Sequence, residues 1–489
     1  MPEPGTLKKA FNDGLSTIVT NVASGQEAVV LAELCGQMSD SKGLVHVCAN
    51  PQQVLGIADS MSFFASWLEV ITLPAWDCLP YDRVSPSTQV IADRIEAFSR
   101  MVAARSEDKP LLVLTTANAL LQKNIPKEVL TNQQTNLAPG NQVDMDALVA
   151  RLSGEGFERT STVRERGEFA IRGGILDIFV PGREEPLRLD FFGDTLESIR
   201  TFDPVTQRTT SQLQNFSLQA MSEVSLTKGM IQSFRRNYLE MFGAATRDDA
   251  LYQAISENRR YAGMEHWLPL FYEKLDDLFD YAEGFKFTYA IDLREALESR
   301  EEQIRDHYEA RHQAIEQKIE GGTPYKPVSP ETLYLGSSEA IEYLKDNGAV
   351  GISPFDQPEN ADTRVLDGGG RVGRNFAAER SAGQNVFEAV SKHIRELQSA
   401  GKKILLAAWT EGSKDRLSQV LDEHDLGSLK AVANYGEFTT AKGNAPSIAV
   451  LPIEHGFETE KTAVLAEQDI LGDRLVRRSK KRKDKDFIS

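Results

Sequence analysis

Short apolar runs alternate with amphipathic stretches from the start of the chain to about Thr135. The apolar runs at 43–50, 68–76 and 110–121 read GLVHVCAN, LEVITLPAW and PLLVLTTANALL. Such runs are typical of buried strands, and the stretches between them have the spacing of amphipathic helices. Strands that alternate with helices predict a parallel sheet covered by helices, so an α/β fold is expected here.

The pattern changes near residue 137, where short strands separated by turn residues are expected. A helix is predicted over 144–154, with Asp144 as its amino-terminal cap. Strands are predicted within 167–182, 186–192, 195–203 and 204–209. Gly193 and Asp194 form a two-residue hairpin signal between two of these strands. We therefore expect a compact, strand-rich insert.

Helical patterns return near Lys228, and a long charged helix is expected from about Leu293 to Ile319. A third region follows, with a predicted helix at 385–401 and predicted strands at 403–409 and 447–453. This region is again expected to be α/β.

The segment 17–34, TIVTNVASGQEAVVLAEL, combines a strand pattern, a turn of small residues and a helix pattern. A nucleotide phosphate loop, G-x-x-x-x-G-K-[ST], has the same layout. Here Thr20 stands at the first glycine and Gly25 at the second, while Gln26 and Glu27 replace the lysine and the hydroxyl residue. Because Glu27 brings a negative charge to the phosphate position, we interpret the segment as a degenerate loop that binds no nucleotide.

Charge and composition exclude further classes of function. The formal net charge of −17 argues against a protein that binds DNA over its whole surface, because nonspecific DNA affinity comes from Lys and Arg. The basic tail, Arg474 to Ser489, is the exception, and a solvated linker is the favoured interpretation. Cys35, Cys48 and Cys78 have no metal-like spacing, and no stretch suits a signal peptide or a membrane span. We therefore expect a cytoplasmic protein without a metal site.

Two further stretches imitate catalytic signatures. GGGRVG at 368–373 fits G-x-G-x-x-G but follows a polar segment instead of a strand, so a flexible linker is expected. DEHD at 422–425 resembles a helicase acidic box but ends a helical pattern, so a solvated helix end is expected. The 7 histidines are scattered. No autonomous active site is predicted, and the chain by itself is not expected to be an enzyme.

The insert carries a more informative pattern. In PLRLDFFGD, a period of two places Arg188, Asp190 and Phe192 on one face of a strand. The opposite, core face is formed by Leu187, Leu189 and Phe191. Arginine and large aromatic residues are enriched at protein interfaces, but an Arg188–Asp190 ion pair on a solvated face is an equally good interpretation. Arg172, just before a glycine pair, could project to the same side.

Several of these motifs resemble one family. GEFAIRGGILDIFVPG and PLRLDFFGDTLESIRTFDPVTQRT are similar to the insert shared by the excision-repair protein UvrB and the bacterial transcription-repair coupling factors, the Mfd family. WDCLPYDRVSPS resembles the Mfd version of the preceding loop, and EHGFE with EQDILGDRLVRR resembles the end of the third Mfd domain and its linker. UvrB has an intact phosphate loop, which this chain lacks, so Mfd is favoured. The resemblance covers nearly the whole chain.

The resemblance implies a degenerate RecA-like, helicase-like parallel-sheet module that is split by a small α+β insert and followed by a small α/β domain. The two halves of the module are expected at 1–135 and 220–340, and the UvrA-binding insert at 136–219. The third domain is expected at 341–465 and a basic linker at 466–489.

The resemblance also implies a function. Members of the family recognise stalled RNA polymerase, displace it by ATP-driven translocation on DNA, and recruit UvrA through the insert. The family uses two arginines and a phenylalanine for UvrA, and matching the motifs places them at Arg172, Arg188 and Phe192. Truncating each side chain is expected to weaken UvrA binding while leaving the fold intact.

The motor, with its ATP and Mg²⁺, and the polymerase-binding domain are expected to lie beyond this chain. The chain would then be a monomer that recruits UvrA without translocating. In the family, the carboxy-terminal domain covers the UvrA surface, so this chain is expected to bind UvrA more readily than a full-length protein.

Two other functional classes stay open. The first is an ATPase or helicase subunit, against which the missing phosphate-loop lysine and hydroxyl count. The second is a nonspecific DNA-binding module that uses the basic tail. Nucleotide binding distinguishes the first class from UvrA recruitment.

Overall fold

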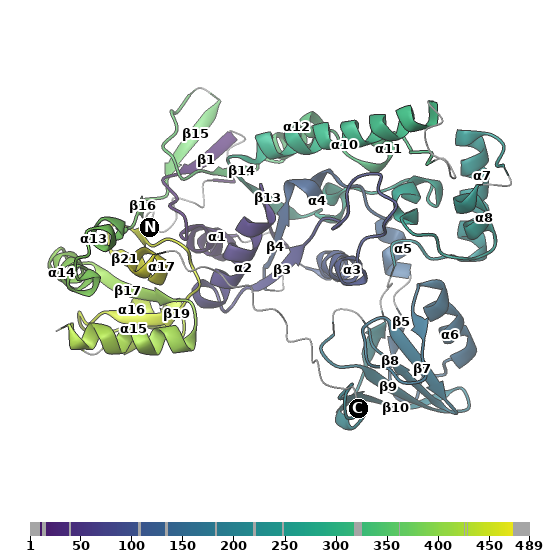
Figure 1. Ribbon diagram of the computed structural model, residues 1–489, viewed down its shortest axis with the longest axis horizontal. Coiled ribbons are helices and arrows are strands. Elements are labelled where there is room, and N and C mark those ends of the chain that lie inside the picture. Colours follow the sequence, from purple (N-terminus) through teal and green to yellow (C-terminus); the bar gives the residue numbers. More distant parts are fainter. Residues whose placement is uncertain are drawn as a thin grey trace. The chain divides into compact units, whose positions relative to one another are not determined.

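The computed structural model describes residues 10–11, 16–38, 41–105, 109–132, 135–180, 183–218, 222–246, 249–316, 325–360, 362–424, 426–427 and 429–472. The chain folds as two compact units (Figure 1). Unit 1 consists of Met1–Met38, Leu55–Glu69 and Val350–Ser489, and unit 2 consists of Ser39–Val54 and Val70–Ala349. Unit 1 is therefore assembled from stretches that are far apart in the sequence, whereas the two stretches of unit 2 are separated only by Leu55–Glu69.

A parallel sheet forms the centre of unit 2. Its strands lie in the order β13 (Phe285–Ala290), β2 (Gly43–Cys48), β4 (Leu111–Thr116) and β3 (Glu69–Leu73). β2 pairs in parallel with both β13 and β4, and every residue of β2 and β4 is buried. Burial on both faces is typical of parallel sheets that helices cover on both sides. The three strands predicted before Thr135 are confirmed, and so is the α/β class.

Helices account for much of the rest of unit 2. They are α3 (Thr88–Ala103), α4 (Ala117–Leu121), α5 (Lys127–Asn132), α7 (Lys228–Phe242), α8 (Ala250–Ser256), η2 (Met264–Leu270), α9 (Leu278–Tyr281), α10 (Leu293–Glu316), α11 (Pro330–Leu333) and α12 (Ser337–Asp346). Another helix, α2 (Pro51–Phe64), begins in unit 2 and ends in unit 1. The long charged helix predicted from Leu293 is α10, and the end predicted at Ile319 lies outside the described residues.

The strand-rich insert of unit 2 builds its own core. Its six-stranded sheet has the order β11 (Thr209–Leu213), β10 (Thr195–Phe202), β9 (Leu187–Phe192), β8 (Ile175–Ile178), β7 (Glu168–Arg172) and β6 (Glu158–Arg159). α6 (Met145–Gly154) begins after Asp144, which accepts a hydrogen bond from the Ala147 N–H over 2.9 Å, as predicted. Leu152 of this helix shares a buried cluster with Leu187 and Leu189 of the sheet.

Tight turns join the central strands of the insert. Gly193, with φ +59°, and Asp194 connect β9 to β10, as the hairpin signal predicts. Gly173, with φ +62°, and Gly174 connect β7 to β8. Both first glycines occupy the left-handed region, which glycine adopts without steric cost.

The strand expected at 204–209 is wrong, because a turn occupies the first half of this range. Residues 204–206 form the turn, and β11 begins only at Thr209. The Asp203 carboxylate accepts hydrogen bonds from the N–H groups of Val205, over 3.1 Å, and Thr206, over 2.6 Å. An aspartate that binds backbone N–H groups two and three residues ahead favours a turn over an extended strand.

A buried ion pair fastens the chain where it returns from the insert. β5 (Thr135–Leu137) and β12 (Phe216–Leu218) pair in antiparallel fashion, so the chain leaves and re-enters at one place. Beyond β12, the Glu223 carboxylate accepts hydrogen bonds from Nε of Arg94 and Nε1 of Trp76, each over 2.8 Å. The side chains of Arg94 and Glu223 are 0% and 2% exposed. Arg94 also donates to the Pro74 carbonyl over 2.7 Å, so the pair is well supplied with partners.

Unit 1 begins with parallel strands. β1 (Ser16–Thr20) pairs in parallel with β14 (Val350–Ile352) and β15 (Thr363–Asp367). α1 (Glu27–Gln37) follows β1 after a short turn. β14 and β15 fall within the range 341–465 assigned to the third domain, yet they pair with a strand that starts at residue 16.

A second sheet of unit 1 is formed by the third region. Its order is β16 (Arg371–Val372), β20 (Phe457–Glu458), β21 (Thr462–Ala466), β17 (Lys403–Ala408), β19 (Ser447–Val450) and β18 (Lys430–Ala431). Its helices are α13 (Ala377–Ser381), α14 (Val386–Ser399), α15 (Glu411–Glu423), α16 (Tyr435–Thr440) and α17 (Glu467–Leu471). The α/β prediction for this region is confirmed. DEHD spans the end of α15, as expected: Asp422 and Glu423 are the last two residues of the helix and His424 follows it. The last residue of DEHD and the basic tail lie outside the described residues.

The glycine-rich stretch at 368–373 is packed against the loop after β1. The N–H groups of Gly368 and Gly370 donate to the carbonyls of Thr20, over 2.7 Å, and Asn21, over 2.8 Å. A Cβ added at Gly370 would lie 1.6 Å from Oε1 of Gln26. The expected flexible linker is therefore wrong here, because the missing side chains allow a close backbone approach.

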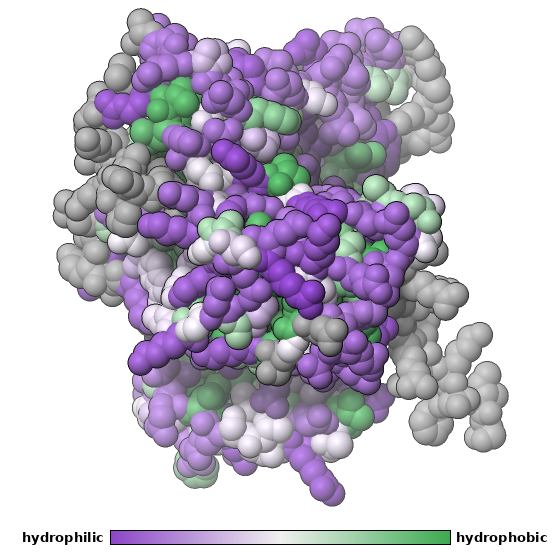
Figure 2. Space-filling model, turned by 90° about the vertical axis from the view of Figure 1, so that its left-hand side faces the viewer, coloured by the Kyte–Doolittle hydropathy of each residue, from purple (hydrophilic) through white to green (hydrophobic). Residues whose placement is uncertain are grey.

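The surface of unit 1 is largely hydrophilic on the face in Figure 2, where hydrophobic residues form small separate groups. Within the described residues, no helix is both long and apolar enough to cross a membrane.

Glu223→Ala should lower the free energy of unfolding by about 3–5 kcal/mol, because it leaves the Arg94 guanidinium buried without its carboxylate. Chemical denaturation measures the change. The matched control is Glu257→Ala, which breaks an Arg259–Glu257 pair in which both side chains are 61% exposed. Its expected cost is below about 1 kcal/mol. Equal effects of the two substitutions would contradict the assignment of Glu223 as an anchor.

Candidate functional site

The degenerate phosphate loop has the predicted layout of strand, turn and helix, and its own side chains occupy it. Gln26 is 0% exposed; its Oε1 accepts a hydrogen bond from the Ala23 N–H over 3.1 Å, and its Nε2 donates to the Gly368 carbonyl over 3.0 Å. Oε2 of Glu27 accepts from the Gly25 N–H over 2.7 Å. A phosphate would bind through such backbone N–H groups. Here the N–H groups of Ala23 and Gly25 already donate to side-chain oxygens, which take the place of a phosphate.

Packing reinforces this arrangement, although burial disfavours the charged form of Glu27. Burial raises the pKa of Glu27 to about 7. Thr20, at the position of the first glycine, donates from Oγ1 to the Leu366 carbonyl over 3.4 Å. A Cβ added at Gly25 would lie 2.7 Å from the His455 carbonyl oxygen, so another backbone segment approaches the turn closely. The loop thus serves as a packed junction within unit 1.

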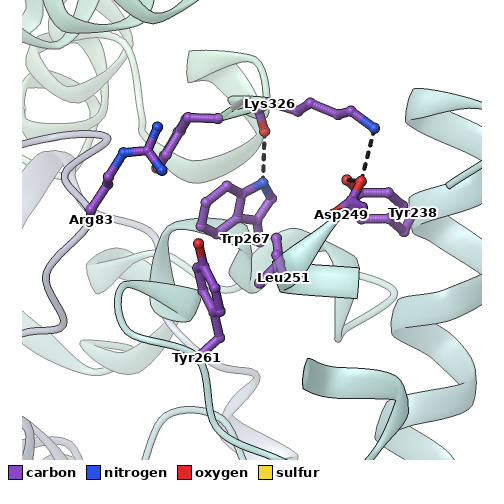
Figure 3. Close-up of a pocket in the computed structure, with 8 residues that line it drawn as sticks. Arg83, Tyr238, Asp249, Leu251, Tyr261, Trp267 and Lys326 are labelled. Carbon is purple, nitrogen blue, oxygen red and sulfur yellow. Dashed lines mark hydrogen bonds and ion pairs between the residues drawn. The ribbon is translucent and has the colours of Figure 1, made fainter. Parts of the chain in front are cut away.

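A small polar pocket in unit 2 is too tight for a substrate (Figure 3). Nζ of Lys326 pairs with Asp249 over 3.0 Å, and Nε1 of Trp267 donates to the Lys326 carbonyl over 2.7 Å. Arg83 and Tyr261 also line the pocket. Its free volume of about 10 Å³ accommodates roughly one water molecule. We therefore assign it no ligand.

The alternation predicted for β9 is confirmed. Leu187 and Leu189 are 0% and 1% exposed, whereas Phe192 is 77% exposed. Arg188 and Asp190 are half-buried on the same side of the strand as Phe192. We call this side of the insert sheet the Arg188 face.

Arg188 is held firmly by neighbouring strands. Its Nε and Nη2 donate to the two carboxylate oxygens of Asp177 over 2.7 and 2.8 Å, and its guanidinium lies 4.5 Å from the ring centroid of Phe202. The Asp177 side chain is 2% exposed and that of Arg188 is 17% exposed. The alternative Arg188–Asp190 pair is wrong, because Asp190 pairs with Arg200 over 2.7 Å. A bidentate contact and a stacked ring leave Arg188 little freedom.

Arg172 lies on the same face. It stands opposite Ile175, which stands opposite Asp190, and residues directly opposite on neighbouring strands point to the same side. Its exposed side chain donates from Nη2 to the Ser161 carbonyl over 2.7 Å. The register therefore brings together all three residues matched to the family motif, Arg172, Arg188 and Phe192.

Sequence reasoning missed the groups that position Arg188. Asp177 is the charged residue in the otherwise apolar strand ILDI, which was a usable signal for a buried polar contact. Phe202 and Gln207 gave no such signal. The Gln207 carbonyl accepts from Nη1 of Arg188 over 3.4 Å, and Gln207 has φ +61°, which sequence patterns do not reveal.

Comparison with known families places two matches on the chain. Residues 135–223 match the family described as the UvrB interaction domain. Residues 397–470 match the family described as the D3 domain of MFD. The first match covers the whole insert together with Glu223.

Similar proteins carry the name transcription-repair-coupling factor. The relative from Rickettsia bellii is 27% identical over 450 residues, which are 92% of this chain and 38% of the relative. The Escherichia coli relative is 26% identical over 482 residues, 98% of this chain and 40% of the relative. The Mycobacterium bovis relative is 36% identical over 158 residues, 31% of this chain and 13% of the relative. The resemblance to the amino-terminal region of these proteins is confirmed. The chain spans about two fifths of the length of the first two.

Glu27→Gln should stabilise the protein at pH 8 and have little effect near pH 4.5. Because the pKa of Glu27 is raised from 4.5 to about 7, the unfolded chain loses this proton at a lower pH than the folded chain. Stability is therefore lost as the pH rises through this window. The neutral amide keeps an oxygen for the Gly25 N–H and avoids the loss. Melting temperatures from pH 4.5 to 8 test this, and a difference that stays constant with pH would refute it.

Arg188→Ala should lower the free energy of unfolding by about 3 kcal/mol, because it strands the buried Asp177 carboxylate. The sequence predicts an intact fold after this truncation, whereas the Asp177 pair leads us to expect a loss of stability. Phe192→Ala should change stability by less than about 0.5 kcal/mol, and Leu189→Ala should cost about 2–5 kcal/mol. Urea denaturation measures all three. The double substitution Arg188→Ala with Asp177→Ala should recover part of the loss, and a larger loss in the double variant would argue against the pair.

Proposed function

We propose that this chain recruits UvrA, through the Arg188 face of its insert, to lesions where RNA polymerase has stalled. The observation that carries the proposal is the exposed Phe192 on the same strand face as a fixed Arg188, inside the region that matches the UvrB interaction domain. An arginine and an aromatic residue are the types that most often dominate binding energy at protein interfaces.

The contacts of the face support this role physically. Arg188 is already ordered by Asp177 and Phe202, so binding would cost little of its side-chain entropy. Arg172 donates hydrogen bonds to the Ser161 carbonyl and to the hydroxyl oxygen of Thr162. Both acceptors are neutral, so these hydrogen bonds do not neutralise the positive charge of Arg172. An exposed cation and an exposed aromatic ring on one face fit a partner surface with carboxylates around an apolar depression.

The wider role is part of the same proposal. The chain would be the amino-terminal part of a transcription-repair coupling factor, with a degenerate RecA-like module, acting as a cytoplasmic monomer. The full-length protein would displace RNA polymerase by translocating on DNA with ATP and Mg²⁺, and its carboxy-terminal domain would cover the UvrA surface.

We propose further that the chain itself is not an ATPase. The hydrogen bonds from the N–H groups of Ala23 and Gly25 to side-chain oxygens support this, because a phosphate would have to displace Gln26 and the Glu27 carboxylate. Calorimetric titration with Mg-ATP separates this proposal from the ATPase alternative, which requires binding. The net charge of −17 disfavours the DNA-binding alternative for the folded part.

Phe192→Ala should weaken binding to purified UvrA about thirtyfold, which corresponds to roughly 2 kcal/mol for a central aromatic anchor. Arg172→Ala should also weaken it. The matched control is Phe355→Ala, which removes a 69% exposed phenylalanine from unit 1 and should leave the affinity unchanged. Calorimetry or surface plasmon resonance measures the affinities, and melting curves on the same samples verify folding. Parental affinity of a folded Phe192→Ala variant would rule out this face.

A further inference from the structure

The two most exposed large hydrophobic side chains in the described part of the chain both belong to the insert. Val205 is 84% exposed and Phe192 is 77% exposed. They lie at opposite ends of β10. Phe192 pairs with Thr195, the first residue of β10, and Val205 comes three positions after Phe202, the last residue of β10. An apolar side chain left this exposed is a candidate contact for a partner.

The turn that carries Val205 is rigidly built. The Asp203 carboxylate binds the N–H groups of Val205 and Thr206, and the Asp203 N–H donates to the Arg208 carbonyl over 2.9 Å. The hydrogen bonds that this carboxylate accepts, first from Thr206 and then from Val205, hold the pKa of Asp203 below its usual value. Gln207 closes the turn with φ +61°, a conformation that is uncommon outside glycine. A turn fixed in this way presents Val205 at a small entropic cost on binding.

Gln207 places the turn on the Arg188 face. Its carbonyl accepts from Nη1 of Arg188, and its Nε2 donates to the Val163 carbonyl over 3.0 Å. Val163 belongs to a small buried cluster with Ala170 and Phe202. Ala170 stands opposite Asp177, which stands opposite Arg188, so this cluster lies on the Arg188 face. Phe192, Arg188 and the Val205 turn thus follow one another along one side of the insert.

The spacing suits a single protein interface. Phe192 and Arg188 are four positions apart along β9, which is about 13 Å at the strand rise. The Val205 turn lies beyond Arg188 on the side away from Phe192. An interface of ordinary size buries about 800 Å² on each partner and can span such a distance.

We propose that the Val205 turn is a second apolar anchor for the protein that binds the Arg188 face. The partner would offer an apolar depression for Val205, separate from the one for Phe192, and carboxylates for Arg172, which lies on β7 on the other side of β9 from this turn. This inference rests on the proposed UvrA recruitment and adds a contact that the family motif match does not include.

The test compares Val205→Asp with Val372→Asp in binding to purified UvrA. Val372 is 76% exposed on β16 of unit 1, so it matches Val205 in residue type and exposure. Val205→Asp should weaken binding at least tenfold, because it places a charge in an apolar contact. Val205→Ala should weaken it less, and Val372→Asp should bind as the parent does. All variants should melt like the parent, since both side chains point into solvent.

The outcomes separate the two proposals. Loss of binding in Phe192→Ala with parental binding in a folded Val205→Asp overturns the second anchor and leaves UvrA recruitment standing. Equal weakening by Val205→Asp and Val372→Asp also overturns it, because the effect is then a general one of added negative charge. Absence of UvrA binding by the parent chain overturns both proposals.

Discussion

The ion pair between Arg94 and Glu223 is the constraint on which the architecture of unit 2 depends. The insert interrupts a module whose parallel strands β2 and β13 lie on either side of it in the sequence, yet they pair side by side. This is possible because the chain leaves and returns through the paired strands β5 and β12, and because the returning segment is fixed at Glu223. A buried carboxylate with two strong donors tolerates only one position of that segment. The insert can therefore present the proposed binding face without loosening the parallel sheet of unit 2.

The same physical rule, that buried polar groups need partners, explains the hydrogen bonds of the degenerate loop between β1 and α1. The backbone N–H groups of Ala23 and Gly25 face into the structure and need acceptors. Gln26 and Glu27 supply them from within the loop, and the amide of Gln26 also joins the loop to the Gly368 carbonyl. The loop is a structural junction of unit 1. The raised pKa of Glu27 reflects the burial of its carboxylate in this junction.

On the insert, folding and recognition share a residue. Arg188 neutralises the buried Asp177, stacks on Phe202 and holds the Gln207 turn, while it also forms the centre of the proposed binding face. The side chains of Phe192 and Val205 contribute little to stability, since they are mostly exposed to solvent. A loss of partner binding on truncating Arg188 would combine two effects, whereas the same loss at Phe192 or Val205 would report recognition alone.

The sequence by itself determined the features that depend on local order. The alternation in β9, the Gly193 turn, the Asp144 cap and the layout of the degenerate loop all follow from the strand and helix periods or from turn chemistry. The motifs were also specific enough to indicate the family. Tertiary structure alone decided which partners those residues found. Arg188 meets Asp177 instead of the nearer Asp190 because strand register, and not sequence distance, sets which side chains are opposite. The stretch at 368–373 reads as a linker but packs on Thr20 and Asn21, since the space that its glycines fill is created by a segment from the other end of the sequence.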